Sequence, residues 1–161
     1  YSTRREEQPF FFRHLVSTLY AFKSDEQSCN WIMEMFLQIQ ALLAESSNKE
    51  KLDKVLYLLD IFILAVVVLS GCAVLLGNLD SVATQRKDRF ALFPESMQFM
   101  CEHIFWKDQE AKIYEFLYNL YKNSAIPEAY AAIFKNAIIC SRNKSYFDNK
   151  GIWTKYVGMR K

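Results

Sequence analysis

The most constraining feature of the sequence is an uncharged segment of 19 residues, Ile61 to Leu79. A segment of this kind either lies inside a folded domain or crosses a bilayer, whose hydrocarbon core requires roughly 20 apolar residues. Asp60 and Asp80 flank it directly, and no lysine or arginine cluster or aromatic belt adjoins its end. We therefore expect a buried core helix, with a single membrane span over Ile61–Leu79 as the alternative.

Composition indicates that the rest of the chain can cover such a core with helices. Hydrophobic residues make up 52% of the chain and aromatic residues 16%, which excludes intrinsic disorder. Only 4 glycines and 3 prolines occur, too few for the many tight turns of a β-sandwich or barrel. The net charge of +2 is too balanced to indicate a nucleic-acid-binding protein. The sequence thus predicts an all-α fold.

Apolar residues recur at helical spacing along most of the chain, and capping signals separate the segments. Ser24 to Gln27 and Ser47 to Glu50 are capping boxes, whose side chains satisfy free backbone amides of a first helical turn. Proline predicts further helix starts at Phe93–Glu95 and at Pro127. We interpret residues 78–89 as a polar connection. The expected architecture is a helical bundle or short α-solenoid of six to seven helices.

Charge divides the chain into one predicted helical domain, residues 1–142, and a basic aromatic C-terminal segment, residues 143–161. From Lys135 onward, seven lysines and arginines accompany a single acidic residue, with aromatic residues interleaved. This pattern is typical of a surface for acidic peptides, phosphate or single-stranded nucleic acid, or of a solvated tail. We favour the solvated tail. The first residue is Tyr1, and we interpret the chain as a fragment of a larger protein.

Cysteines and histidines lack the spacing of chemical sites. The four cysteines are at least 29 residues apart, so we expect reduced thiols in a cytoplasmic or nuclear protein. His14 and His103 lie among apolar residues of predicted helices, and we interpret both as structural. Cys101, two residues from His103, points to another helix face and does not share a metal with it. We expect no enzyme activity, no metal and no cofactor.

Three tyrosines, Tyr114, Tyr118 and Tyr121, form a row at helical spacing beside a separate apolar stripe. Such a row is either a platform for a partner, since tyrosine is enriched among interface hot spots, or the second packing face of a helix between neighbours. We favour the packing interpretation.

The segment Glu110–Leu120 resembles the second helix of an armadillo repeat, because its apolar pattern ends in an Asn-Leu pair. Ala125–Phe134 resembles the third helix, and Met97–Trp106 takes the place of the short first helix. Residues 94–138 together resemble one armadillo/HEAT-type repeat at superfamily level. Asn123-Ser124 stands where the family has a glycine. The resemblance implies stacked helices whose concave face binds an extended peptide or helix, as in cytoskeleton-associated scaffolds.

We therefore predict a protein–protein interaction scaffold that binds a peptide or helix of a partner protein in a helix-lined groove. Small-molecule substrates, nucleic acids and membranes are not the expected partners. Rim lysines would select an acidic partner. The expected contact set is Lys135, Asn136, Lys144, Trp153 and Tyr156.

A Bcl-2-like bundle is the alternative interaction module. Such bundles surround a strongly apolar central helix with amphipathic helices and bind an amphipathic helix in a surface groove. The pair Asn30-Trp31 begins an earlier helix and is followed by Ile32-Met33 rather than Gly-Arg. This difference argues against the alternative.

Overall fold

The computed structural model describes residues 8–21, 24–45, 49–104 and 107–141, and within these ranges it contains helices and no strand. The all-α prediction is confirmed. The described helices number eight, of which α4 and α5 are short. In chain order they are α1 (Gln8–Tyr20), α2 (Asp25–Glu45), α3 (Lys49–Leu69), α4 (Cys72–Leu75), α5 (Leu79–Thr84), α6 (Arg86–His103), α7 (Lys107–Lys122) and α8 (Glu128–Ser141).

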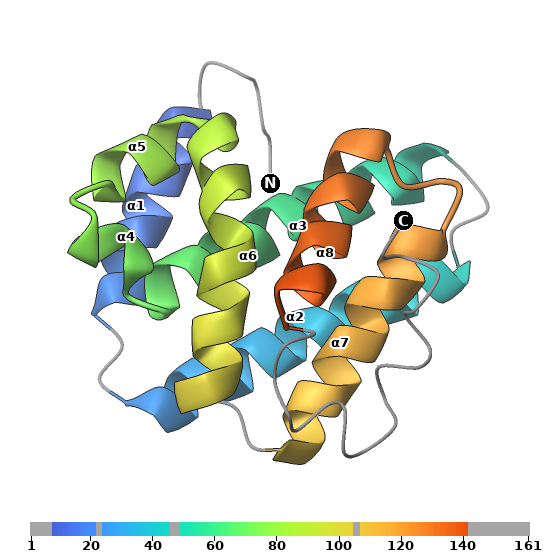
Figure 1. The fold of residues 1–161 in the computed structure, drawn as a ribbon. Coiled ribbons are helices and arrows are strands. Elements are labelled where there is room, and N and C mark those ends of the chain that lie inside the picture. The colour runs from blue at the N-terminus through green and yellow to red at the C-terminus, as the bar shows by residue number, and fades with distance from the viewer. Residues whose placement is uncertain (1–7, 22–23, 46–48, 105–106, 142–161) are drawn as a thin grey trace.

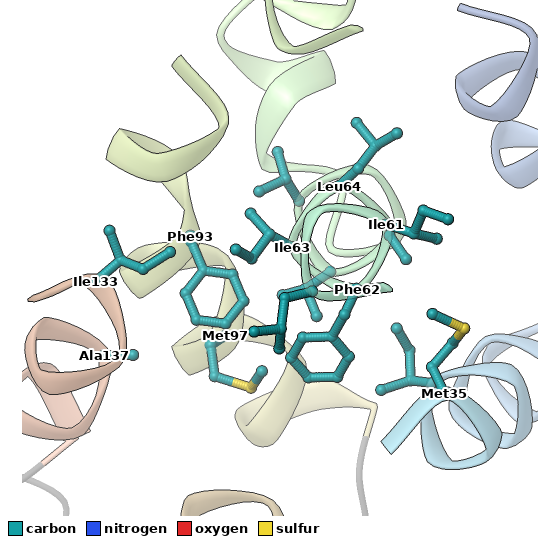
Figure 2. Close-up of a cluster of buried hydrophobic side chains, with 14 of the residues drawn as sticks. Met35, Ile61, Phe62, Ile63, Leu64, Phe93, Met97, Ile133 and Ala137 are labelled. Carbon is teal, nitrogen blue, oxygen red and sulfur yellow. The ribbon is translucent and has the colours of Figure 1, made fainter. Parts of the chain in front are cut away.

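Helix α3 is the axis of the fold. It packs against α1, α2, α5 and α6 and crosses the middle of the bundle (Figure 1). Every residue from 61 to 68 is buried. Figure 2 looks along this helix and shows the side chains of Ile61 to Leu64 pointing in different directions around it, with Ile63 facing Phe93 of α6. Because α3 is covered on all sides along this stretch, it has no exposed face there to carry charged residues.

Only the first half of the uncharged segment belongs to α3, which ends at Leu69. The remainder forms α4, the turns on either side of it and the first residue of α5. Within the described ranges, no helix is long and apolar enough to span a bilayer. This finding goes against the single-span alternative over Ile61–Leu79.

Aromatic side chains join the second half of the chain to α3. The ring of Phe62 lies 6.1 Å from that of Phe93 on α6 and 5.8 Å, edge-on, from that of Phe116 on α7. The ring of Phe93 in turn meets Phe134 of α8 at 5.9 Å. All four rings are buried. Aromatic pairs at these distances add specific geometry to hydrophobic burial, so they fix how α6, α7 and α8 pack around α3.

Two of the predicted helix starts are confirmed. The backbone N–H of Gln27 donates to Ser24 Oγ at 3.2 Å, as expected for the residue capping α2. Helix α8 begins directly after Pro127, whose carbonyl accepts from Tyr130 and Ala131 at 3.0 Å each. Ser47 and Asn48 of the second capping box lie outside the described residues, and its last two residues, Lys49 and Glu50, are the first residues described in α3.

The predicted polar connection over residues 78–89 is wrong. Helix α5 occupies residues 79–84, and α6 begins at Arg86, so Pro94 lies inside a helix rather than in its first turn. The reason is that the charged run finds partners in the fold. Arg86 Nη2 donates to Asp60 Oδ2 at 3.2 Å, and Arg89 Nη1 donates to the carbonyl of Val82 at 2.8 Å.

Asn123, rather than glycine, forms the turn between α7 and α8. Its Oδ1 accepts from the N–H of Ala125 at 2.9 Å, and its carbonyl accepts from the N–H of Ile126 at 3.1 Å. No described residue other than glycine has a positive φ, so this turn does not require the glycine of the armadillo family. Helix α8 packs against both α6 and α7. The armadillo resemblance over residues 94–138 stays a prediction.

Candidate interaction site

The end of α3 is closed by a serine side chain. Ser70 Oγ donates to the carbonyl of Val67 at 2.9 Å and accepts from the N–H of Cys72 at 3.2 Å. Gly71 follows with φ +79°, and its N–H donates to the carbonyl of Val68 at 3.1 Å. These bonds satisfy the last carbonyls of a buried helix, and the left-handed glycine turns the chain away from the core.

A second glycine ends α4 one turn later. Gly77 has φ +71°, and its N–H donates to the carbonyl of Val74 at 3.0 Å. The N–H of Asn78 donates to the carbonyl of Ala73 at 2.7 Å. This pair of bonds is the Schellman motif, which stops a helix by means of a left-handed residue. Helix α4 is therefore a single turn with both ends fixed by hydrogen bonds.

The turn presents three consecutive apolar side chains to solvent. Val74 is 37% exposed, Leu75 81% and Leu76 58%, whereas Ala73 faces the bundle and is buried. We call Val74, Leu75 and Leu76 the α4 knob. Figure 1 places α4 at one edge of the bundle, beside α5 and away from α7 and α8. Adjacent exposed apolar residues of this kind are typical of interaction sites.

The α4 knob and its neighbours in the sequence carry no charge. The segment from residue 70 to residue 79 contains no charged side chain. The first acidic residue after it, Asp80, is paired with Arg13 of α1 at 3.2 Å between Oδ1 and Nε. Both members of this pair are at least half exposed, so it contributes little to stability. The α4 knob is thus an uncharged surface beside a neutral ion pair.

The α4 knob could not be recognised from its apolar residues alone. Val74 to Leu76 continue the apolar pattern of α3, so they look like more of the same core helix. The sequence signal for this turn is a pair of glycines, Gly71 and Gly77, within the uncharged segment. The whole chain has only four glycines. Glycine in the left-handed conformation ends helices, so two of them six residues apart indicate a short exposed turn.

The contact set predicted from the sequence is only partly described. Lys135 and Asn136 lie on α8, where Lys135 is half-buried and Asn136 is exposed. Lys144, Trp153 and Tyr156 lie outside the described residues. The set as a whole therefore stays a prediction.

The tyrosine row on α7 packs against the bundle. Tyr114 is buried, while Tyr118 and Tyr121 are half-buried and pack against the core. The Nζ of Lys122 lies 5.6 Å from the centre of the Tyr118 ring. These positions favour the packing interpretation over a platform for a partner.

A buried polar cluster joins α3, α6 and α8. Tyr130 of α8 donates from its hydroxyl to Asp60 Oδ1 at 3.0 Å, and both residues are 6% exposed. Arg86 holds the other carboxylate oxygen, as described above. Arg89 is buried with its guanidinium carbon 4.5 Å from the centre of the Phe12 ring of α1. The cluster thus connects helices that are distant in sequence.

Burial dominates the electrostatics of this cluster. It raises the pKa of Asp60 above the usual 3.8, against the lowering effects of Arg86, the Tyr130 hydrogen bond and Arg89. Burial also raises the pKa of Tyr130 and lowers that of Arg89. Asp60, Arg89 and Tyr130 are buried, whereas Arg86 reaches Asp60 from an exposed position. The arrangement is typical of a buried polar network that fixes helix packing.

Histidines and cysteines show no convergent chemistry. His14 of α1 and His103 of α6 are both exposed, and their interpretation as structural residues stays a prediction. His103 lies against the Phe99 ring and 3.6 Å from a carboxylate oxygen of Glu102. Across the described ranges, no three histidine, cysteine or acidic side chains are grouped as metal ligands. Cys29, Cys72 and Cys101 are thiols rather than disulfides, and Cys29 Sγ donates to Gln109 Oε1 at 3.0 Å.

Comparison with protein-family models, with curated proteins and with solved structures finds no match to this chain.

Proposed function

We propose that this chain is a helical protein-interaction module that binds a partner protein through the α4 knob. The observation that carries the proposal is the exposure of three adjacent apolar residues, 74–76, on a turn held by hydrogen bonds at both ends. Exposed apolar surface lowers the free energy of association when a partner covers it. The proposal contains no catalytic step, metal or cofactor, and it places the protein in the cytoplasm or nucleus.

The other described large apolar residues with high exposure do not form a comparable group. Tyr20 ends α1, Leu37 lies on α2, and Phe11 packs near the ring of Tyr57 at 6.0 Å. Single exposed apolar residues are ordinary on protein surfaces and need no partner. The α4 knob differs because its three members are consecutive.

A photo-crosslinking experiment tests the proposal. The amino acid p-benzoylphenylalanine replaces Leu75 in one sample and Asn136 in another, since both positions are exposed and the second belongs to the contact set predicted from the sequence. Each cross-linked protein is identified, purified and titrated calorimetrically against the unmodified chain. We expect saturable binding of at least one such protein. If no purified cross-linked protein binds, the interaction function is contradicted.

Charge reversal then separates the two surfaces. The double variant Lys135→Glu/Lys144→Glu weakens binding if the basic C-terminal set makes the contact, and Leu75→Ser weakens it if the α4 knob does. Both variants are checked by thermal unfolding, because a loss of binding is informative only in a folded protein. We expect the Leu75 variant to lose affinity and the double variant to keep it.

A further inference from the structure

We infer that helix α1 is a removable cover, and that the surface beneath it binds an amphipathic helix of another protein that carries a carboxylate. We call this surface the α1 seat. It is formed by the parts of α3, α5 and α6 that α1 covers. Figure 1 shows α1 beside α5 at one edge of the bundle. The α1 seat is a different surface from the α4 knob, and the inference does not depend on that knob.

Helix α1 itself shows what kind of element the α1 seat accepts. Its buried side chains, Phe12, Val16 and Leu19, are spaced four and three residues apart and therefore form one stripe. Arg13 and His14 are exposed. A helix with one apolar stripe and a polar remainder is amphipathic, so the α1 seat is complementary to an amphipathic helix.

The α1 seat contains a buried cation whose hydrogen bonding is incomplete. Arg89 is 3% exposed, and its Nη1 donates to the carbonyl of Val82 at 2.8 Å. Among the described residues, none accepts a hydrogen bond from its Nε. The carboxylate of Asp60 bonds to Tyr130 and Arg86 instead. A buried donor without an acceptor is unfavourable, so a partner that supplies an acceptor gains free energy there.

Helix α1 does not supply that acceptor. Its contact with Arg89 is the ring of Phe12, whose centre lies 4.5 Å from the guanidinium carbon. This cation–π contact compensates for part of the burial of the charge, but it leaves Nε without a hydrogen bond. No residue of α1 is acidic, and the buried cluster beneath it combines two arginines with one aspartate. A helix with a glutamate in place of Phe12 would bring a carboxylate to the position of the ring.

The contacts that hold α1 outside its buried stripe are exposed. The ion pair between Arg13 and Asp80 joins two side chains that are at least half exposed, so it contributes little. Phe11 is also exposed where its ring meets that of Tyr57 at 6.0 Å. The attachment of α1 therefore depends mainly on the stripe, which a partner helix can reproduce. Because α1 is tethered at an effective concentration of roughly millimolar, the partner needs an additional contact, and the carboxylate provides it.

A second copy of the chain is a poorer occupant than an acidic helix. It would bring an identical α1, and with it the same Phe12 ring. Exchange of α1 between two copies therefore leaves Arg89 Nε without an acceptor and the excess positive charge unchanged. Only a helix of different sequence corrects both.

Peptide titration of the full chain tests whether α1 is removable. The variant Phe12→Ala loosens α1 without changing the α1 seat, and Phe11→Ala, at the exposed neighbouring position, is the matched control. The probes are two fluorescent peptides of residues 8–21, one with the natural sequence and one with Phe12→Glu. We expect both peptides to bind the Phe12→Ala chain at least about 10-fold more tightly than the Phe11→Ala chain, because a buried ring contributes more than an exposed one.

Substitution of Arg89 tests the carboxylate. In the Phe12→Ala chain, Arg89→Met should lower the affinity for the acidic peptide by about 10-fold or more, since close charge pairs couple strongly. The affinity for the natural peptide should fall by no more than about 5-fold, the size of a cation–π contact. Thermal unfolding checks that each variant is folded. If Arg89→Met does not fold, Arg89→Lys replaces it and should again weaken the acidic peptide more than the natural one.

Three outcomes overturn the inference. Failure of the peptides to bind the Phe12→Ala chain, or equal binding to the Phe11→Ala chain, shows that α1 is not a removable cover. An acidic peptide whose affinity does not depend on residue 89 refutes the carboxylate-bearing partner. Dimerisation of the Phe12→Ala chain in light scattering, reversed by the natural peptide, identifies a second copy as the occupant. None of these outcomes affects binding through the α4 knob, which the cross-linking experiment tests separately.

Discussion

Removing the hydroxyl of Tyr130 tests how much the buried hydrogen bond between Tyr130 and Asp60 contributes to the stability of the fold. In Tyr130→Phe, Asp60 Oδ1 loses a donor at 3.0 Å while the ring and its apolar contacts remain. Arg86 still holds Oδ2 at 3.2 Å, so the carboxylate is left half-satisfied. A hydrogen bond to a charged group contributes about 1.5–3 kcal/mol to the free energy of unfolding. We expect a loss of about 2 kcal/mol, or about 4–8 °C in Tm for a domain of this size.

The cost of Tyr130→Phe depends on pH in a direction that the structure fixes. Burial raises the folded-state pKa of Asp60 above 3.8, so the native protein takes up this proton at a higher pH than the unfolded chain. The contribution of Asp60 to stability is therefore greatest at low pH and falls as pH rises through its folded-state pKa. Losing the Tyr130 donor raises that pKa further. The deficit of the variant must then be larger at about pH 7.5 than at about pH 4.

Urea unfolding followed by circular dichroism at the two pH values measures both effects. Asp60→Asn is the matched control, because an amide keeps an oxygen to accept from Tyr130 but carries no charge. In the Asp60→Asn background, the cost of Tyr130→Phe should become independent of pH over this range. A deficit below about 0.5 kcal/mol, the range of ordinary surface substitutions, would refute the assignment of a buried, charged bond. A deficit equal at both pH values would refute the electrostatic reasoning.

Three other substitutions test the core, a turn and a cap by the same unfolding assay. Phe62→Ala should cost about 3–5 kcal/mol, because its buried ring contacts rings of α6 and α7, and a loss under about 1.5 kcal/mol would mean that this site is not core. Gly77→Ala should cost about 1–2 kcal/mol from its φ of +71° alone, since a Cβ there meets nothing within 4 Å; an unchanged Tm would contradict the left-handed turn. Ser24→Ala should cost about 1 kcal/mol by removing the α2 cap, whereas Ser24→Asp should restore most of it.

Sequence patterns predicted the features that depend on local chemistry. Ser24 and Pro127 mark helix starts because capping and a fixed φ act within one turn of the chain. The uncharged run after Asp60 identified the core helix because burial on every side leaves no position for a charge. Lys135 and Asn136 of the predicted contact set lie on a helix, α8. No local sequence pattern specifies whether that part of the helix surface binds a partner.

The features that were missed depend on contacts between distant segments. Arg86 and Arg89 look like a solvated connection, yet the fold supplies Asp60 and the carbonyl of Val82 as partners. Whether a charged segment forms a helix or an irregular connection depends on the partners that the folded structure provides. Patterns in a single sequence do not show those partners. The α4 knob was missed for the opposite reason. Apolar residues are assigned to the core by default, and only the positive φ of Gly71 and Gly77 turns them outward.

The all-round burial of α3 has a consequence for synthesis of the protein. Residues 61–68 leave the ribosome before α6, α7 and α8, whose side chains cover much of their surface, have been made. During that interval the nascent chain carries eight consecutive apolar residues with incomplete cover, the kind of segment that aggregates or recruits chaperones. We expect the chain to remain chaperone-bound until α8 is complete, and ribosome-bound chains ending near residue 105 to be far more protease-sensitive than those extended past residue 141.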